Sequence, residues 1–224
     1  MDPVTFTTED GVTLQGELRL PERPSRGVAV LCHPHPRHGG SKDHPLLWAI
    51  RNHLAAERGL AVLGFNFRGV MDSGGTYGGG RDELRDVRAA IGWLRSRVAR
   101  KGADGTPPTL VVGWSFGASV ALGEALDDPR VDAIALVGIP LRPNDLSLPA
   151  LPDRADLRLF RRPALLVAGE HDDYCPLGEL REFGASFPYA RVEILDGTDH
   201  YFWRRERDVA QLIGAFAEAT LASD

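Results

Sequence analysis

The residue best suited to chemistry in this sequence is Ser115, which lies in the pentapeptide Gly113-Trp114-Ser115-Phe116-Gly117. An apolar run, 110–112, leads into the pentapeptide, and the small-residue segment 116–126 follows with helical character. A Gly-x-Ser-x-Gly motif between a strand and a helix is typical of a nucleophilic serine, because the tight turn lifts the hydroxyl clear of the sheet. The helix dipole then favours negative charge that develops there. A turn with a capping serine is the alternative, and the strand and helix around the motif favour the nucleophile.

A serine at neutral pH needs a general base, and the base needs a carboxylate that holds its tautomer. His200 follows Asp199 after the last predicted strand, 192–195, and is the candidate base. Asp172 and Asp173 follow the strand 164–168, and on position alone either could be the acid. The chain order serine, acid, histidine is the order found with such a serine on a parallel sheet.

Two backbone amides are expected to stabilise the oxyanion that forms during acyl transfer. The first donor is predicted to be the amide of Phe116, directly after the nucleophile. The second is expected in the loop 32–40, which follows a buried strand. Pro34 and Pro36 have no N–H, so His35 is the predicted donor.

The elements that must position these residues alternate along the chain. An Asp10-Gly11 turn joins two strands in a predicted hairpin, and buried apolar runs then alternate with helical patterns. This order predicts an α/β fold whose central sheet has about eight strands, is antiparallel at its N-terminal edge and is otherwise parallel, with helices on both faces. Predicted strands span 4–7, 12–20, 28–32, 61–67, 109–112, 131–137, 164–168 and 192–195, and predicted helices 46–55, 84–94, 116–126 and 209–216.

Composition narrows the class of protein further. The 224 residues suit one domain over 1–224, and a net charge of −5 argues against nucleic acid or an anionic membrane as partner. No long apolar run or leader pattern is seen, and two cysteines cannot build a disulfide framework. We therefore expect a cytoplasmic protein, monomeric or homodimeric, whose cysteines are reduced.

Several segments together resemble the α/β-hydrolase superfamily, and more narrowly small bacterial hydrolases related to dienelactone hydrolases and serine aminopeptidase-like esterases. The matching segments are His33-Pro34-His35-Pro36 with Gly39-Gly40, 65–70 with Ser73 and Gly75, 113–118, Gly169 with Asp172 and Pro176, and 199–202. The resemblance implies the α/β-hydrolase fold and Asp172 as the acid, three residues after the glycine. It also implies a minimal lid, about 140–162. Met71 stands where most relatives have glycine, and is expected to reshape the floor of the substrate pocket. Dienelactone hydrolases use a cysteine nucleophile, whereas this chain has serine.

Other features have a structural interpretation beside a functional one. Four histidines are clustered in one segment, which could indicate a metal site: His33, His35, His38 and His44. They lack the spacing typical of metal ligands, so a role in shaping the loop is favoured. The glycines of 74–80 lack the ending of a phosphate-binding loop. Arg68 is expected in a structural ion pair, with substrate-anion binding as the alternative. Trp114 and Tyr201 are candidate substrate-binding residues beside the catalytic positions, with core packing as the alternative.

These residues predict a serine hydrolase that cleaves small carboxylic esters through an acyl-enzyme, with a small-molecule acyl substrate and neither metal nor cofactor. A thioesterase or a peptidase would use the same triad. A non-catalytic protein of the same fold would have no need of all three residues in order. A metal-dependent hydrolase built on the histidine cluster would lose activity with a chelator.

Overall fold

The computed structural model describes residues 2–98, 106–142 and 148–221. Its centre is an eight-stranded sheet with the strand order β1-β2-β4-β3-β5-β6-β7-β8. The first two pairings are antiparallel and the others are parallel, as predicted. The strands are β1 (Asp2–Thr7), β2 (Thr13–Arg19), β3 (Gly27–Cys32), β4 (Leu60–Phe65), β5 (Thr109–Trp114), β6 (Ala133–Val137), β7 (Ala164–Gly169) and β8 (Ala190–Leu195).

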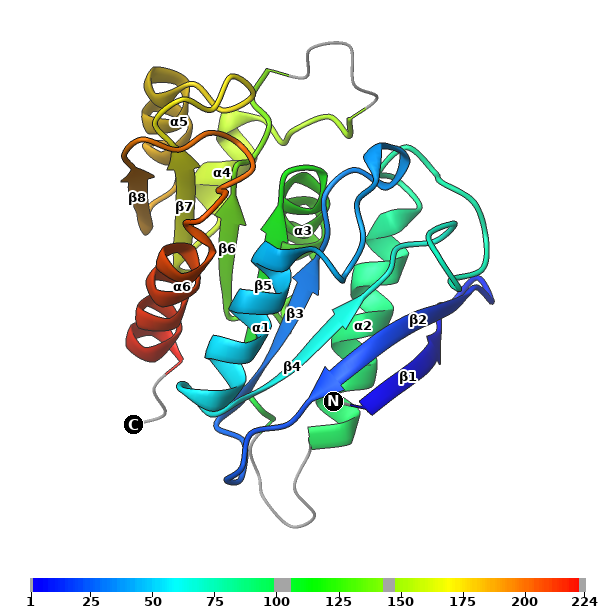
Figure 1. The fold of residues 1–224 in the computed structure, drawn as a ribbon. Coiled ribbons are helices and arrows are strands. Elements are labelled where there is room, and N and C mark those ends of the chain that lie inside the picture. Colours follow the sequence, from blue (N-terminus) through cyan, green and yellow to red (C-terminus); the bar gives the residue numbers. More distant parts are fainter. Residues whose placement is uncertain (1, 99–105, 143–147, 222–224) are drawn as a thin grey trace.

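Helices cover both faces of the sheet (Figure 1). One apolar core includes residues of α1 and α6, and the other includes residues of α2, α3, α4 and α5 on the opposite face. The helices are α1 (Pro45–Ala56), α2 (Glu83–Val98), α3 (Phe116–Asp127), α4 (Arg154–Leu159), α5 (Leu177–Gly184) and α6 (Glu206–Thr220), with a 3₁₀ turn η1 at Pro36–His38. The sequence did not predict α4 and α5, because these short helices bury only one and two of their residues.

The five strands β3 to β7 are buried along their whole length, as expected of parallel strands covered on both faces. The chain runs from β3 outward to β4 and then returns to β5 on the other side of β3. Ligands of open α/β sheets bind at such a switch in strand order, beyond the carboxyl ends of the strands. The loops after β3 and β5 are the ones that contain His35 and Ser115.

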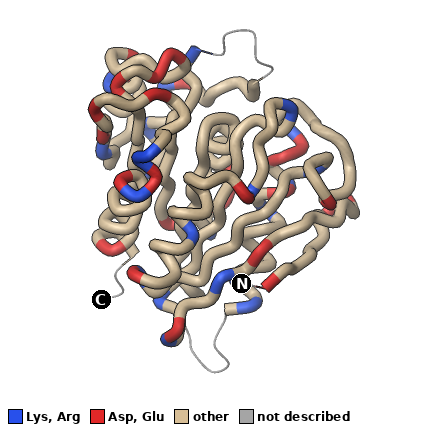
Figure 2. Tube along the Cα trace, viewed as in Figure 1, with Lys and Arg blue, Asp and Glu red and all other residues tan. Residues whose placement is uncertain are grey.

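Positive and negative residues are interspersed along the trace in the view of Figure 2, without a face of one sign. Within the described residues, no helix is both long and apolar enough to cross a membrane. Both cysteines, Cys32 and Cys175, are buried and unbridged.

Candidate active site

Ser115 occupies a strained turn between β5 and α3. Its backbone angles are φ 55° and ψ −121°, a region that residues with side chains rarely adopt. A Cβ atom on Gly113 would lie 2.2 Å from the carbonyl oxygen of Gly117, and one on Gly117 would lie 2.3 Å from that of Cys32. Only glycine fits at both positions, so the pentapeptide is explained by how closely the backbones approach.

A chain of hydrogen bonds joins Ser115, His200 and Asp172. The Nε2 atom of His200 lies 2.9 Å from Ser115 Oγ. The Nδ1 atom lies 2.9 Å and 2.8 Å from the two carboxylate oxygens of Asp172. All three side chains are buried, although they come from three different loops at one edge of the sheet.

The two candidate acids, Asp172 and Asp173, have different surroundings in the structure. The Asp172 carboxylate faces His200, while Asp173 is exposed to solvent. Oδ1 of Asp172 also accepts hydrogen bonds from the amides of Tyr174 at 3.0 Å and Cys175 at 3.1 Å. These bonds fix the carboxylate in the turn after β7. Burial raises the pKa of the Cys175 thiol, so this cysteine is protonated and unreactive.

Trp114 supports the histidine loop from within the core. Its side chain is 2% exposed and its indole Nε1 donates a hydrogen bond to the His200 carbonyl oxygen at 3.2 Å. The ring packs at 4.3 Å from that of His44, on the side of the sheet covered by α1 and α6. The structure therefore gives Trp114 a packing position instead of the predicted place in a substrate pocket.

Two tyrosines flank the imidazole of His200. Tyr201 was a candidate from the sequence; it is 47% exposed, and its ring centre lies 5.8 Å from that of His200. Tyr174, which the sequence reasoning missed, lies closer, with 4.8 Å between ring centres. Its position two residues after Asp172 was the available signal.

The two predicted oxyanion donors lie in neighbouring loops. Phe116 is the first residue of α3, where helix amides have no partner within the helix. The side chain of His35 packs on Phe116 with 5.2 Å between ring centres, and its Nε2 lies 3.3 Å from the hydroxyl of Tyr77. A Cβ on Gly117 would also lie 2.5 Å from the His33 carbonyl oxygen, so the backbone after β3 runs directly beside the serine turn.

The clustered histidines shape their loops. Nδ1 of His33 lies 2.6 Å from the Pro34 carbonyl oxygen, and its Nε2 accepts a hydrogen bond from the Phe67 amide at 3.0 Å. Burial lowers the pKa of His33 to about 4, which keeps the ring neutral. His44 caps α1 by accepting a hydrogen bond from the Leu46 amide. In the part of the chain that the structure describes, no group of three or more His, Cys, Asp or Glu residues could hold a metal.

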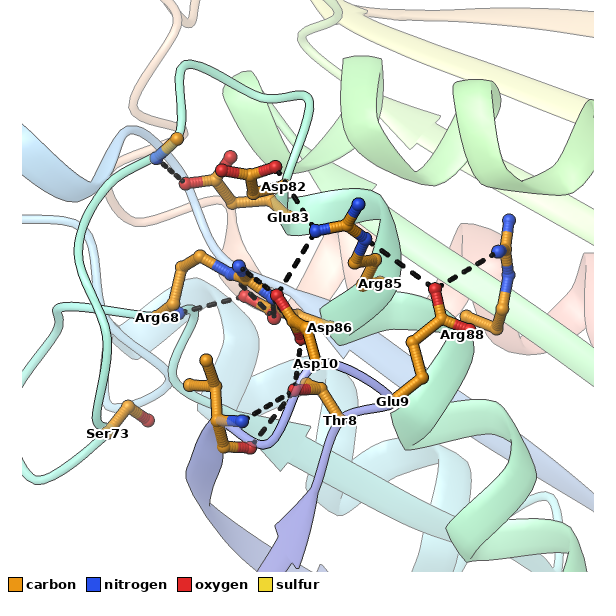
Figure 3. Close-up of polar contacts among 12 residues, drawn as sticks. Thr8, Glu9, Asp10, Arg68, Ser73, Asp82, Glu83, Arg85, Asp86 and Arg88 are labelled. Atoms are coloured by element: carbon orange, nitrogen blue, oxygen red, sulfur yellow. Dashed lines mark hydrogen bonds and ion pairs between the residues drawn. The ribbon is translucent and has the colours of Figure 1, made fainter.

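Arg68 is committed to carboxylates of the protein itself (Figure 3). It is 4% exposed, and its Nε and Nη2 atoms donate to Asp86 Oδ1 at 2.9 Å and 2.7 Å. Its Nη1 atom donates to Asp10 at 2.9 Å, and these bonds hold the pKa of Asp10 well below its usual range. Arg68 thus ties the hairpin turn to α2, as the structural interpretation predicted.

The glycine-rich loop also satisfies a carboxylate of the protein. The amides of Gly78 and Gly80 donate to the two oxygens of Glu83 at 2.8 Å and 2.7 Å, which leaves these donors engaged within the fold. Met71, just before this loop, has φ 50°, the left-handed conformation in which glycine is favoured. Its side chain is 70% exposed, so it does not lie in the floor of an enclosed pocket, where the resemblance had led us to expect it.

Comparison with known proteins agrees with this fold. The family described as "Alpha/beta hydrolase domain" matches residues 28–223, and the chain belongs to this family. A serine hydrolase homologue from Coxiella burnetii has a TM-score of 0.81 and 23% identity, with 96% of each chain covered. XC6422 from Xanthomonas campestris, described as a serine hydrolase without lid, has a TM-score of 0.81 and 23% identity over 100% of this chain and 96% of its own. The esterase Pf2001 from Pyrococcus furiosus has a TM-score of 0.80 and 20% identity over 99% of this chain and 93% of its own. At these identities the structures establish a shared fold, and the family match places the chain in the α/β-hydrolase superfamily.

Proposed function

We propose that this protein is a serine hydrolase that cleaves small carboxylic esters by an acyl-enzyme mechanism. The observation that carries the proposal is the unbroken hydrogen-bond chain from Ser115 Oγ through His200 to Asp172. A serine hydroxyl becomes nucleophilic when an adjacent base removes its proton, and that base works when a carboxylate orients it. The esterase from Pyrococcus furiosus shares the fold, which supports an ester as the substrate.

In the first step, Ser115 Oγ attacks the ester carbonyl while His200 Nε2 takes the hydroxyl proton. Asp172 accepts the hydrogen bond from Nδ1 and stabilises the imidazolium that forms. The amides of Phe116 and His35 are proposed to donate to the oxyanion, each amide contributing about 3 kcal/mol to the transition state. The imidazolium then gives its proton to the departing alcohol, and the acyl group stays on the serine.

In the second step, His200 takes a proton from water and the hydroxide attacks the acyl-serine. Collapse of this second intermediate releases the carboxylic acid and returns the proton to Ser115. The imidazole thus serves both halves of the reaction, and the structure needs to hold it in only one place.

We further propose one domain with a minimal lid formed by residues 140–162. In its described part this segment contributes α4, and the amides of Leu141 and Arg142 donate to the Tyr174 carbonyl oxygen at 2.8 Å and 3.0 Å. Residues 143–147 lie outside the described part of the chain. A short lid suits small substrates that reach the serine directly.

The test is hydrolysis of p-nitrophenyl acetate by Ser115→Ala beside a matched control, Ser119→Ala. Ser119 is a buried serine in α3, the helix that follows Ser115, and its Oγ has no hydrogen-bond partner among the described residues. Ser115→Ala should lose about 10⁴-fold or more in kcat, because a missing triad residue abolishes nucleophilic catalysis. Ser119→Ala should keep wild-type kcat. Ser115→Ala turnover equal to that of the wild type would contradict the mechanism.

A fluorophosphonate probe gives an independent measurement, since it labels only an activated serine. Wild-type protein should be labelled at Ser115, and absence of labelling would favour a non-catalytic member of the fold. A panel of oxygen esters, thioesters and peptide amides, compared by kcat/KM, would then separate an esterase from a thioesterase or a peptidase, because all three use the same triad.

A further inference from the structure

Two large aromatic side chains stand in solvent directly beside the proposed catalytic histidine. Tyr201 is 47% exposed and Trp203 is 57% exposed. Their rings lie nearly parallel, at 22°, with centres 6.5 Å apart, and the centre of the Tyr201 ring lies 5.8 Å from that of His200. We call these two residues the aromatic platform. Exposed side chains of this size lose apolar contact with the core, so their position calls for a reason.

The backbone holds the platform outward at a cost in strain. Phe202, which lies between Tyr201 and Trp203 in the sequence, has φ 55° and is fully buried, and Arg204 has φ 64°. Each such conformation costs about 1–3 kcal/mol and persists where the surroundings enforce it, often at functional sites. The buried Phe202 ring anchors the loop in the core while its neighbours point to solvent.

Hydrogen bonds also fix the loop on either side of the platform. The carbonyl oxygen of His200 accepts from the Trp114 indole at 3.2 Å, and the Tyr201 amide donates to the Asp199 carboxylate at 2.9 Å. Arg205, which follows the platform, bonds to the Asp208 side chain and the Asp196 carbonyl oxygen. The platform is therefore set in place before any substrate arrives, which lowers the entropy lost on binding.

The platform borders the imidazole that is proposed to protonate the departing alcohol. In the proposed mechanism His200 Nε2 protonates the departing alkoxide, so that group passes against the imidazole. Tyr201 is the exposed ring in contact with this imidazole, and Trp203 extends the surface away from it. The carbonyl oxygen of the ester points instead toward the Phe116 and His35 amides, which are the proposed oxyanion donors.

We propose that Tyr201 and Trp203 form a subsite for a planar aromatic alcohol moiety, which makes esters of arylalkyl alcohols the preferred substrate class. This inference rests on the proposed function. The exposed surface of the platform is aromatic, although Trp203 also packs against the His44 ring, with 5.7 Å between ring centres. The nearby Asp199 and Arg205 side chains are bonded within the protein. A sugar ring would need several hydrogen-bonding groups, whereas an aromatic ring is held by stacking alone.

The experiment compares benzyl acetate with cyclohexylmethyl acetate, two esters of primary alcohols that differ in the planarity of the ring. The wild type should favour the benzyl ester in kcat/KM. Trp203→Ala should reduce the benzyl-to-cyclohexylmethyl ratio about 3- to 10-fold, as expected for the loss of one aromatic contact. Trp203→Phe should restore most of the ratio, because it keeps a ring face. Tyr189→Ala serves as the control, since Tyr189 is 59% exposed and precedes β8, away from the platform loop.

A ratio that Trp203→Ala leaves at the wild-type value would overturn the subsite and leave the esterase proposal standing, provided that both esters are hydrolysed in a Ser115-dependent way. An equal fall in the ratio for Tyr189→Ala would also overturn it, because the effect would not be local. If the wild type hydrolyses neither ester but hydrolyses p-nitrophenyl acetate in a Ser115-dependent way, the subsite proposal fails and the esterase proposal stands. Thermal unfolding of each variant shows that the exposed substitutions leave the fold intact.

Discussion

Replacing Gly138 by alanine would place one methyl carbon against the hydrogen bond between His200 and Asp172. Gly138 directly follows β6 and has φ 53°, and its amide donates to the Val167 carbonyl oxygen at 2.7 Å. A Cβ atom built there lies 3.2 Å from Asp172 Oδ2 and from both Nδ1 and Cε1 of His200. Relaxed contacts between such atoms begin near 3.5 Å, so the imidazole or the carboxylate must move by about 0.3–0.5 Å.

The expected kinetic effect follows from that displacement. The bonds from His200 to Asp172 and Ser115 are 2.8–2.9 Å long. Lengthening one of them by about 0.4 Å brings it close to the limit of a useful hydrogen bond. Because a misplacement of 1 Å costs about 10²-fold in rate, we expect Gly138→Ala to lower kcat about 5- to 10-fold. KM should change little, since the substitution lies behind the imidazole.

Alanine at a positive φ also costs about 1–2 kcal/mol of stability, and Gly11→Ala controls for this backbone term. Gly11 has φ 83° in the hairpin turn, and a Cβ there meets no atom within 4 Å. Both variants should lower Tm by about 2–8 °C, and only Gly138→Ala should lower kcat in the p-nitrophenyl acetate assay. Wild-type kcat in Gly138→Ala, or an equal loss in Gly11→Ala, would refute the reasoning.

Three further predictions concern the neighbouring parts of the fold. Asp172→Asn should lower kcat in the p-nitrophenyl acetate assay about 10⁴-fold, because the amide favours the wrong tautomer of His200. Asp173→Asn, at the exposed neighbouring residue, should keep wild-type kcat in the same assay. Similar losses in the two variants would contradict the assignment of Asp172 as the acid. Arg68→Met should lower the free energy of unfolding in urea by about 3–5 kcal/mol, because it leaves the Asp86 carboxylate buried without its cation, and adding Asp86→Leu should recover most of the loss. Stability of Arg68→Met equal to that of the wild type would show that the pair contributes nothing. Burial lowers the pKa of His33 from 6.5 to about 4, so the unfolded chain binds a proton there over a range where the folded chain does not. The contribution of neutral His33 to the free energy of unfolding is therefore complete above pH 6.5. About 3 kcal/mol of this free energy is lost as the pH falls to 4. Urea titrations along this range check it, and His33→Gln should flatten that part of the curve.

The sequence allowed the fold to be predicted because buried strands leave a strong signal. The runs that became β3 and β5 are largely apolar, and the glycine and serine pattern at the end of β5 admits few other structures. The order of Ser115, Asp172 and His200 followed from the strands that precede them. The short helix α5 was missed because its apolar residues Leu177, Leu180 and Phe183 cover only two turns, too short a stretch to establish a helical period.

The same complete burial explains why the role of Trp114 was left open. In a strand with one exposed face, polar and apolar residues alternate, and that alternation shows which way a side chain points. β5 is buried on both faces, so its sequence does not say whether Trp114 faces the substrate or the core. Gly138 was missed for a related reason, since its close approach to Asp172 and His200 joins the turn after β6, the turn after β7 and the loop after β8.

The proposed catalytic serine and the proposed substrate-binding rings therefore differ in how far the sequence predicts them. The proposed nucleophile could be recognised in the sequence because its turn requires glycine at 113 and 117, and a backbone requirement restricts residue type. The direction of the Tyr201 and Trp203 side chains depends instead on the positive φ of Phe202, a conformation that the presence of a phenylalanine does not predict. That conformation is enforced by burial of the Phe202 ring in the core shared with α1 and α6. The Tyr201 and Trp203 rings, which are proposed to bind the alcohol moiety, are thus oriented by packing of Phe202 on the opposite side of the loop. Substitutions at Phe202 should therefore alter substrate preference while leaving the triad residues themselves unchanged.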